Sequence, residues 1–83
     1  MASGVKLLAF AGARDVLGQA EVEFALARPC TTHELMDLVC EQYPGLVPYR
    51  GCLRLAVNGV YAEEADPIRE GDEVAIIPPV AGG

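Results

Sequence analysis

The sequence has few of the residues on which most catalytic centres depend. Its only histidine is His33 and its only serine is Ser3, so a Ser-His pair or a histidine metal site lacks partners. We expect His33 to be a solvated helix residue. No glycine pattern matches GxGxxG or a phosphate-binding loop. The acidic side chains of residues 63–73 lie in a polar connection without a predicted cleft, which favours a solvated face over a metal site. No catalytic constellation is visible.

Basic residues are also scarce. Six Lys and Arg oppose twelve Asp and Glu, which gives a net charge of −6 and an isoelectric point near 4.5. Such a chain repels phosphate, so nucleic acid and anionic membranes are poor candidates for partners, and a basic protein surface is a better one. No segment approaches the roughly 20 apolar residues of a membrane span.

The three cysteines, Cys30, Cys40 and Cys52, form no C-x-x-C pair and leave one thiol over in any disulfide scheme. This pattern fits a reducing cytosol, and we expect a cytoplasmic protein with buried, inert thiols. Lys6 and the apolar residues after it imitate a short secretory signal, but cleavage there would remove the best predicted strand.

The remaining composition is that of one compact domain spanning residues 1–83. Hydrophobic residues make up 52% of the chain, which excludes a disordered protein, and nine Gly and six Pro predict short elements joined by many turns. Thr31 and Glu34 have the spacing of a capping box, and Pro44 stops the helix that this box opens. Asn58-Gly59 is a tight-turn signal. The patterns predict strands at residues 5–11, 21–26, 53–57, 60–61 and 73–77, a short helical turn at 13–17, the main helix at 32–42, and an irregular segment or single turn at 46–50.

This order predicts an α+β fold, a mixed sheet with one main helix on one face. The helix residues predicted to face the sheet are Leu35, Met36, Leu38, Val39, Cys40 and Tyr43. One helix covers only one face, yet the first and last strands are apolar on both alternating faces. We therefore expect an uncovered apolar surface that binds a partner, although a homodimer or a covering loop would also absorb it. Its candidate residues are Phe10, Tyr61, Ile76 and Ile77.

The last six residues follow the final strand and have a composition of their own. Pro78 and Pro79 donate no ladder hydrogen bonds, so the sheet should end near Ile77 and residues 78–83 should project as a tail. Val80 and Ala81 are small. Gly82 and Gly83 lack Cβ atoms and can enter a slot too narrow for other residues, although a frayed terminus would have the same composition.

Both ends of the chain resemble one family. Residues 71–75, Gly-Asp-Glu-Val-Ala, with residues 78–83, Pro-Pro-Val-Ala-Gly-Gly, look like the ending of the small sulfur-carrying subunit of molybdopterin synthase, the MoaD type of ubiquitin-like protein. Residues 5–11, followed by Ala-Arg-Asp at 13–15 and Leu-Gly at 17–18, are similar to that family's first strand and turn. The resemblance covers essentially the whole chain. It implies a β-grasp fold with the first and last strands side by side at the centre.

The resemblance also implies a chemistry for the tail. An adenylyltransferase similar to ubiquitin-activating enzymes would use ATP to convert the carboxylate of Gly83 to an acyl adenylate. In this state alone the chain would carry a nucleotide. Sulfur donated by a persulfide would then displace the nucleotide, so that Gly83 ends in a thiocarboxylate. The chain itself would bind no cofactor. The large synthase subunit, in a heterotetramer with the carrier, would transfer two such sulfurs to a cyclic pterin monophosphate. In this scheme Gly83 carries sulfur, and Gly82, Ala81, Val80, Pro79 and Pro78 enter the partner.

Other roles stay open at this point. A diglycine on a β-grasp domain is shared by carriers for thiamine synthesis, tRNA thiolation and cysteine synthesis. It also occurs in protein modifiers of the ubiquitin kind, which form isopeptides on lysines. A small interaction domain whose tail carries nothing is a further alternative.

Overall fold

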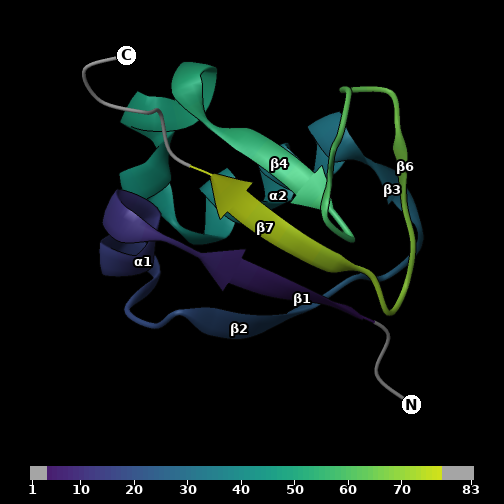
Figure 1. The fold of residues 1–83 in the computed structure, drawn as a ribbon, viewed down its shortest axis with the longest axis horizontal. Coiled ribbons are helices and arrows are strands. Elements are labelled where there is room, and N and C mark those ends of the chain that lie inside the picture. The colour runs from purple at the N-terminus through teal and green to yellow at the C-terminus, as the bar shows by residue number, and fades with distance from the viewer. Residues whose placement is uncertain (1–3, 78–83) are drawn as a thin grey trace.

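The computed structural model describes residues 4–77, which form a five-stranded sheet with one long helix behind it (Figure 1). The strand order is β2-β1-β7-β4-β5. β1 and β7 are parallel, and the other neighbouring pairs are antiparallel. The predicted mixed sheet, with the first and last strands adjacent, is confirmed. The elements are β1 Gly4–Ala9, α1 Ala11–Leu17, β2 Glu21–Ala25, β3 Cys30–Thr31, α2 Thr32–Gln42, η1 Pro44–Cys52, β4 Arg54–Val57, β5 Val60–Tyr61, β6 Pro67–Ile68 and β7 Glu73–Ile77.

The first strand is shorter than predicted because the chain turns into α1 at Phe10. Phe10 has extended backbone angles and is the N-cap of α1, and Ala11 begins the helix with a positive φ of 48°. Phe10 and Ala11 are as apolar as the strand before them, so the pattern of apolar residues did not show where the strand ends. Gly18 closes the helix at φ 84°, where its N–H donates to the carbonyl of Arg14.

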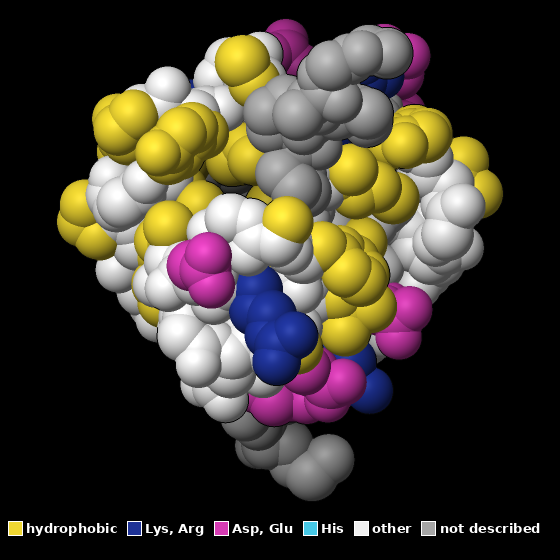
Figure 2. All heavy atoms as spheres, turned by 60° about the vertical axis from the view of Figure 1, so that its left-hand side comes forward, with side chains coloured by type: hydrophobic (Ala, Val, Ile, Leu, Met, Phe, Trp, Pro, Cys, Tyr) yellow, Lys and Arg dark blue, Asp and Glu magenta, His cyan; other side chains and the backbone are white. Residues whose placement is uncertain are grey.

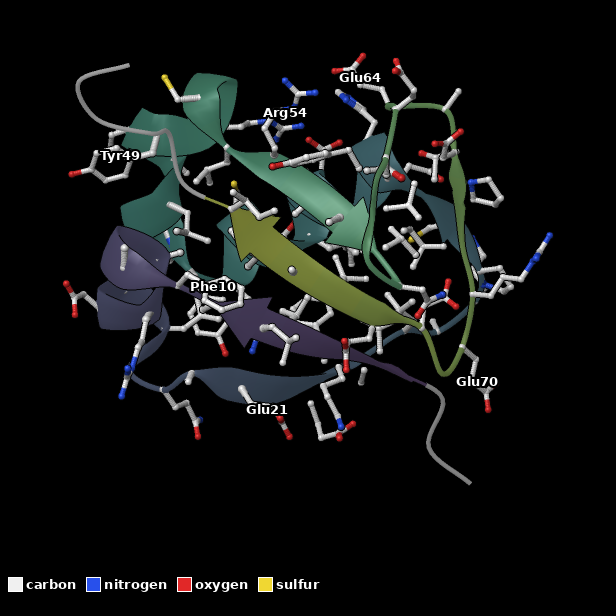
Figure 3. The ribbon with its side chains drawn as sticks, viewed as in Figure 1. Phe10, Glu21, Tyr49, Arg54, Glu64 and Glu70 are labelled. Atoms are coloured by element: carbon white, nitrogen blue, oxygen red, sulfur yellow. The ribbon has the colours of Figure 1, made fainter. Side chains whose placement is uncertain are left out.

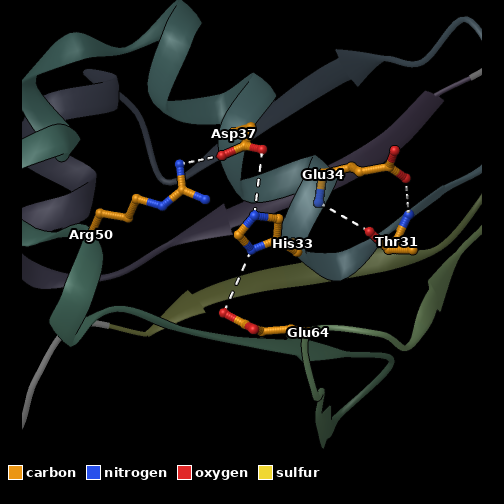
Figure 4. A network of polar contacts seen from close by, with 6 residues as sticks. All are labelled: Thr31, His33, Glu34, Asp37, Arg50 and Glu64. Atoms are coloured by element: carbon orange, nitrogen blue, oxygen red, sulfur yellow. Dashed lines mark hydrogen bonds and ion pairs between the residues drawn. The ribbon is translucent and has the colours of Figure 1, made fainter.

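The main helix begins and ends where its sequence signals predict. The Glu34 N–H donates to Thr31 Oγ1 at 3.1 Å and the Thr31 N–H donates to Glu34 Oε1 at 2.9 Å, which completes the capping box (Figure 4). The helix stops at Gln42, two residues before Pro44. Leu38 was wrongly assigned to the buried face and is 42% exposed, since it lies at the edge of the apolar arc. Thr32 lies nearer the middle of that arc and is buried instead.

A second, two-stranded sheet was not predicted. β3 and β6 pair antiparallel, and Ile68 of β6 is fully buried within a connection that the sequence marks as polar. Thr32 anchors this connection, since its N–H and its Oγ1 both donate to the Asp66 carbonyl, at 2.8 and 2.9 Å. The segment at residues 46–50, expected to be irregular or a single turn, is part of the longer 3₁₀ helix η1.

The hydrophobic core fills the space between α2 and the inner face of the sheet (Figure 1). The fully buried side chains are Val5, Leu7, Leu35, Val39, Leu46, Ile68, Val74 and Ile76.

The predicted turn at Asn58-Gly59 is confirmed, with φ values of 51° and 86°. Among the described residues, no helix is long and apolar enough to cross a membrane.

Candidate functional site

The central strand β7 leads directly to the tail that the sequence singled out. Ile77 is the last described residue and lies opposite Arg54 of β4. The predicted tail residues lie outside the described residues, so the roles given to them stay predictions: Pro78, Pro79, Val80, Ala81, Gly82 and Gly83.

The alternation along β7 separates core from surface. Val74 and Ile76 are 0% exposed and face α2, whereas Ala75 and Ile77 are half-buried and point to the opposite face. Ile76 was therefore wrongly chosen as an interface candidate. Neighbouring Ile residues on a strand must face opposite sides, and the sequence does not fix which one is buried.

The outer face of the sheet is apolar and has no helix over it among residues 4–77 (Figure 1). A row of opposed residues crosses four strands on this face, because Leu8 pairs with Ala75, Ala75 with Ala56, and Ala56 with Tyr61. Directly opposed residues share a face, so these side chains are contiguous. We call this surface the open face, which consists of Leu8, Phe10, Ala56, Tyr61, Ala75 and Ile77.

Two aromatic residues stand out on the open face. Phe10 is 51% exposed and Tyr61 is 61% exposed, although the burial of such large aromatic side chains is strongly favourable. Phe10 lines a hollow with Leu8, Arg14 and Glu21. Figure 2, in which the end of the molecule with α1 comes forward, shows hydrophobic side chains gathered into patches. Contiguous patches of this kind mark sites of protein contact.

Charged groups lie along the margins of the open face. Lys6 Nζ and Glu21 Oε2 are 3.9 Å apart on β1 and β2. On the other side, the guanidinium carbon of Arg54 is 5.5 Å from the centre of the Tyr61 ring. The open face thus has an apolar centre and a polar rim, the usual anatomy of a protein interface.

The polar face of α2 carries a network of contacts but no catalytic arrangement. His33 lies 3.7 Å from Asp37 Oδ2 and 3.5 Å from Glu64 Oε1, and Arg50 pairs with Asp37 (Figure 4). The His33 side chain is 52% exposed, as expected for a solvated helix residue. Within residues 4–77, no group of three or more His, Cys, Asp and Glu side chains could hold a metal ion.

The acidic side chains of residues 63–73 are exposed or hold turns together. Glu63, Glu64, Glu70 and Glu73 are exposed. The Asp72 carboxylate accepts hydrogen bonds from Asn58 Nδ2 at 3.1 Å and from the Arg69 N–H at 2.9 Å. The carboxylate therefore holds two turns together.

Cys30, Cys40 and Cys52 are free thiols. Burial raises the pKa of both the Cys30 and Cys40 thiols above the ordinary value of 9.0, so both are protonated at neutral pH. Only Cys40 is buried, whereas Cys30 is half-buried and Cys52 is exposed, which corrects the expectation that all three thiols are buried.

The sequence identified part of this surface. Phe10, Tyr61 and Ile77 lie on the exposed side as predicted, whereas Leu8, Ala56, Ala75 and Arg54 were missed. The signal for Leu8, Ala56 and Ala75 was the spacing of two along each strand, which becomes usable only once the register between strands is known. Arg54 had no such signal.

Comparisons with known proteins agree on one kind of protein. The sequence model of the ThiS family matches residues 7–83. The molybdopterin synthase sulfur carrier subunit of Arabidopsis thaliana is 34% identical over 79 residues, covering 95% of this chain and 82% of the relative.

Solved structures share the fold. A putative molybdopterin converting factor, subunit 1, from Pyrococcus furiosus superposes with a TM-score of 0.82 at 26% identity, covering 94% of this chain and 99% of that one. Small archaeal modifier protein 1 of Haloferax volcanii superposes with a TM-score of 0.79 at 22% identity, again over 94% and 99% of the two chains. At that identity the second likeness concerns the fold alone.

Proposed function

The chain belongs to the ThiS family, and from this premise we propose that it is the sulfur carrier subunit of a molybdopterin synthase, acting in molybdenum cofactor biosynthesis. The observation that carries this function is the match to a carrier subunit of that name over 95% of the chain. The family match extends to Gly83 and so includes the diglycine end. The resemblance seen at the two ends of the sequence and the predicted β-grasp fold are confirmed.

The proposed chemistry takes place at the carboxylate of Gly83. A terminal carboxylate has an ordinary pKa of about 3.5, so it is ionised at neutral pH and resists nucleophilic attack. In the proposal an adenylyltransferase joins this carboxylate to AMP and releases pyrophosphate from ATP. A persulfide sulfur then attacks the acyl carbon and AMP leaves, which gives an acyl disulfide. A thiol then attacks the donor's sulfur of this disulfide, so that the donor leaves in a new disulfide with the thiol and Gly83 keeps a thiocarboxylate.

The composition of the tail supports delivery into a second active site. Gly82 and Gly83 have no side chains to obstruct a narrow channel, and Val80 and Ala81 are small. Pro78 and Pro79 restrict the free chain, which lowers the entropy lost when the tail is inserted. The tail is proposed to enter the large subunit, where two sulfurs pass to a cyclic pterin monophosphate.

The open face supports docking of the larger partners. Its exposed aromatic residues, Phe10 and Tyr61, are of the type enriched at the centres of protein interfaces. It borders the end of β7, so a partner held there would receive the tail directly. The large synthase subunit is the proposed occupant, and the adenylyltransferase would use the same face in turn. Because this chain is acidic, basic surfaces on the large subunit and on the adenylyltransferase would attract it and speed both associations.

The test is the intact mass of the purified chain after incubation with a cognate adenylyltransferase, ATP and a persulfide donor. The expected result is replacement of one oxygen by one sulfur, absent in a control chain that lacks Gly83. An unchanged mass with a demonstrably active enzyme would contradict the carrier role and favour an interaction domain. A lysine-linked adduct would instead indicate a protein modifier.

A further inference from the structure

Arg54 is placed where a docked partner must meet it. It is exposed, and on β4 it lies opposite Ile77, the last residue before the tail. Figure 3 shows Arg54 and Phe10 on opposite sides of β7, so that the apolar centre of the open face lies between them. A partner that covers Phe10 and Ile77 therefore reaches Arg54 as well.

The Arg54 guanidinium has no carboxylate partner in the described part of the chain. The ion pairs found there join Lys6 to Glu21, Arg50 to Asp37, and His33 to Asp37 and Glu64, and none includes Arg54. Glu63 and Glu64 line the same hollow of about 390 Å³ as Arg54 but form no ion pair with it.

The Tyr61 ring holds the guanidinium instead. The separation of 5.5 Å between the Arg54 guanidinium carbon and the ring centre is within the range of a cation–π contact. A cation–π contact is made by the charge of the guanidinium and does not use its N–H donors for hydrogen bonds. No hydrogen bond of the Arg54 side chain is found among residues 4–77, so its N–H donors remain available to a partner.

Docking makes the lack of a carboxylate costly. When a partner covers the open face, the guanidinium loses water, and an unpaired desolvated charge is strongly unfavourable. A carboxylate on the partner removes this cost and adds a bidentate, charge-assisted pair. A wholly apolar partner surface is therefore rejected at this position.

We propose that Arg54 selects the partner that docks on the open face by pairing with a carboxylate of that partner, beside the root of the tail. The inference rests on the proposed function, since it takes the large synthase subunit as the docked partner. The long-range attraction of a chain of net charge −6 still favours a partner that is basic overall. The partner surface is thus expected to be basic around an acidic group that faces Arg54.

The test compares the affinity of the large subunit for four carriers by titration calorimetry: the wild type, Arg54→Met, Arg54→Lys and the control Arg69→Met. Met keeps an unbranched apolar stem and removes the charge and the N–H donors. Arg69 is exposed in the turn before β7 and is not part of the open face, so it controls for net charge. Thermal unfolding of each carrier checks that all four are folded.

The expected result is a loss of at least about tenfold in affinity for Arg54→Met, partial recovery for Arg54→Lys, and little change for Arg69→Met. In a second arm, Arg54→Glu should regain affinity only with a large subunit in which the facing carboxylate is changed to Lys. If Arg54→Met binds as tightly as the wild type or more tightly, the inference is overturned while the carrier function stands. If the wild type itself does not bind the large subunit, both are overturned.

Discussion

Two adjacent isoleucines provide a stringent test of the sheet's two faces. Ile76 is fully buried against α2, whereas Ile77 is half-buried on the open face. The substitutions Ile76→Ala and Ile77→Ala remove the same atoms from the same strand. Any effect of lower strand propensity, up to about 1 kcal/mol, is therefore similar in the two variants and cancels in their difference.

The expected sizes differ because only one change leaves a cavity. Truncating a buried Ile to Ala costs about 2–5 kcal/mol of unfolding free energy. A domain of this length has about 4–12 kcal/mol in total, so Ile76→Ala removes a large share. Ile77→Ala should cost about 1 kcal/mol, since much of its side chain already contacts water. The variants should thus differ by at least about 1 kcal/mol in unfolding free energy.

The assay is urea unfolding followed by far-ultraviolet circular dichroism, with thermal unfolding alongside. In a domain of this size each kcal/mol shifts the Tm by about 4–8 °C. Should Ile76→Ala fail to fold, Ile76→Val and Ile77→Val repeat the comparison, with an expected cost of about 1 kcal/mol for the first and less for the second. Equal losses for the pair, or a larger loss at Ile77, would refute the assignment of faces. Binding to the large subunit should show the reverse order for folded variants, since Ile77 lies on the open face.

Three further predictions concern local structure. Thr31→Ala removes the capping box and should cost about 1 kcal/mol in urea unfolding, and equal stability would contradict the role of the cap. Hydrogen bonds from the Thr31 backbone and side chain lower the pKa of Glu34 below its ordinary 4.5, so the charged carboxylate stabilises the fold above that pH. The stability advantage of the wild type over Glu34→Gln should therefore be present at pH 7 and disappear as the pH falls below 4.5; an advantage that persists at low pH would contradict this cause. Gly59→Ala places a side chain at φ 86° and should cost about 1–2 kcal/mol, whereas Gly51→Ala, with open space around its Cβ position, should cost less.

Signals that act over a few residues were sufficient to predict much of the fold. The bounds of α2 follow from Thr31, Glu34 and Pro44, because a cap and a proline act on the backbone next to them. The turn at Asn58-Gly59 is equally local. Ile68 was missed because its strand, β6, is two residues long and pairs with Cys30, which is far away in the sequence. Such pairing leaves no periodic pattern to detect.

The candidate site divides in the same way. The tail is a local motif, and its resemblance to a family was visible from the residues themselves. The open face depends on which members of each strand point away from α2, and the pattern Ile76-Ile77 is equally apolar in both registers. Arg54 had no signal of its own, because its position beside the tail arises from the pairing of β4 with β7.

The central claim is that sulfur travels on the carboxyl group of Gly83. Its most direct test mixes a thiocarboxylated carrier with the large subunit and cyclic pterin monophosphate in a single turnover, and follows the mass of the carrier and the appearance of the dithiolene product. We expect the carrier to return to its carboxylate form, with two carriers converted for each product molecule. A carrier that keeps its sulfur beside an active large subunit, or product formed equally well with a carrier lacking Gly83, would contradict it.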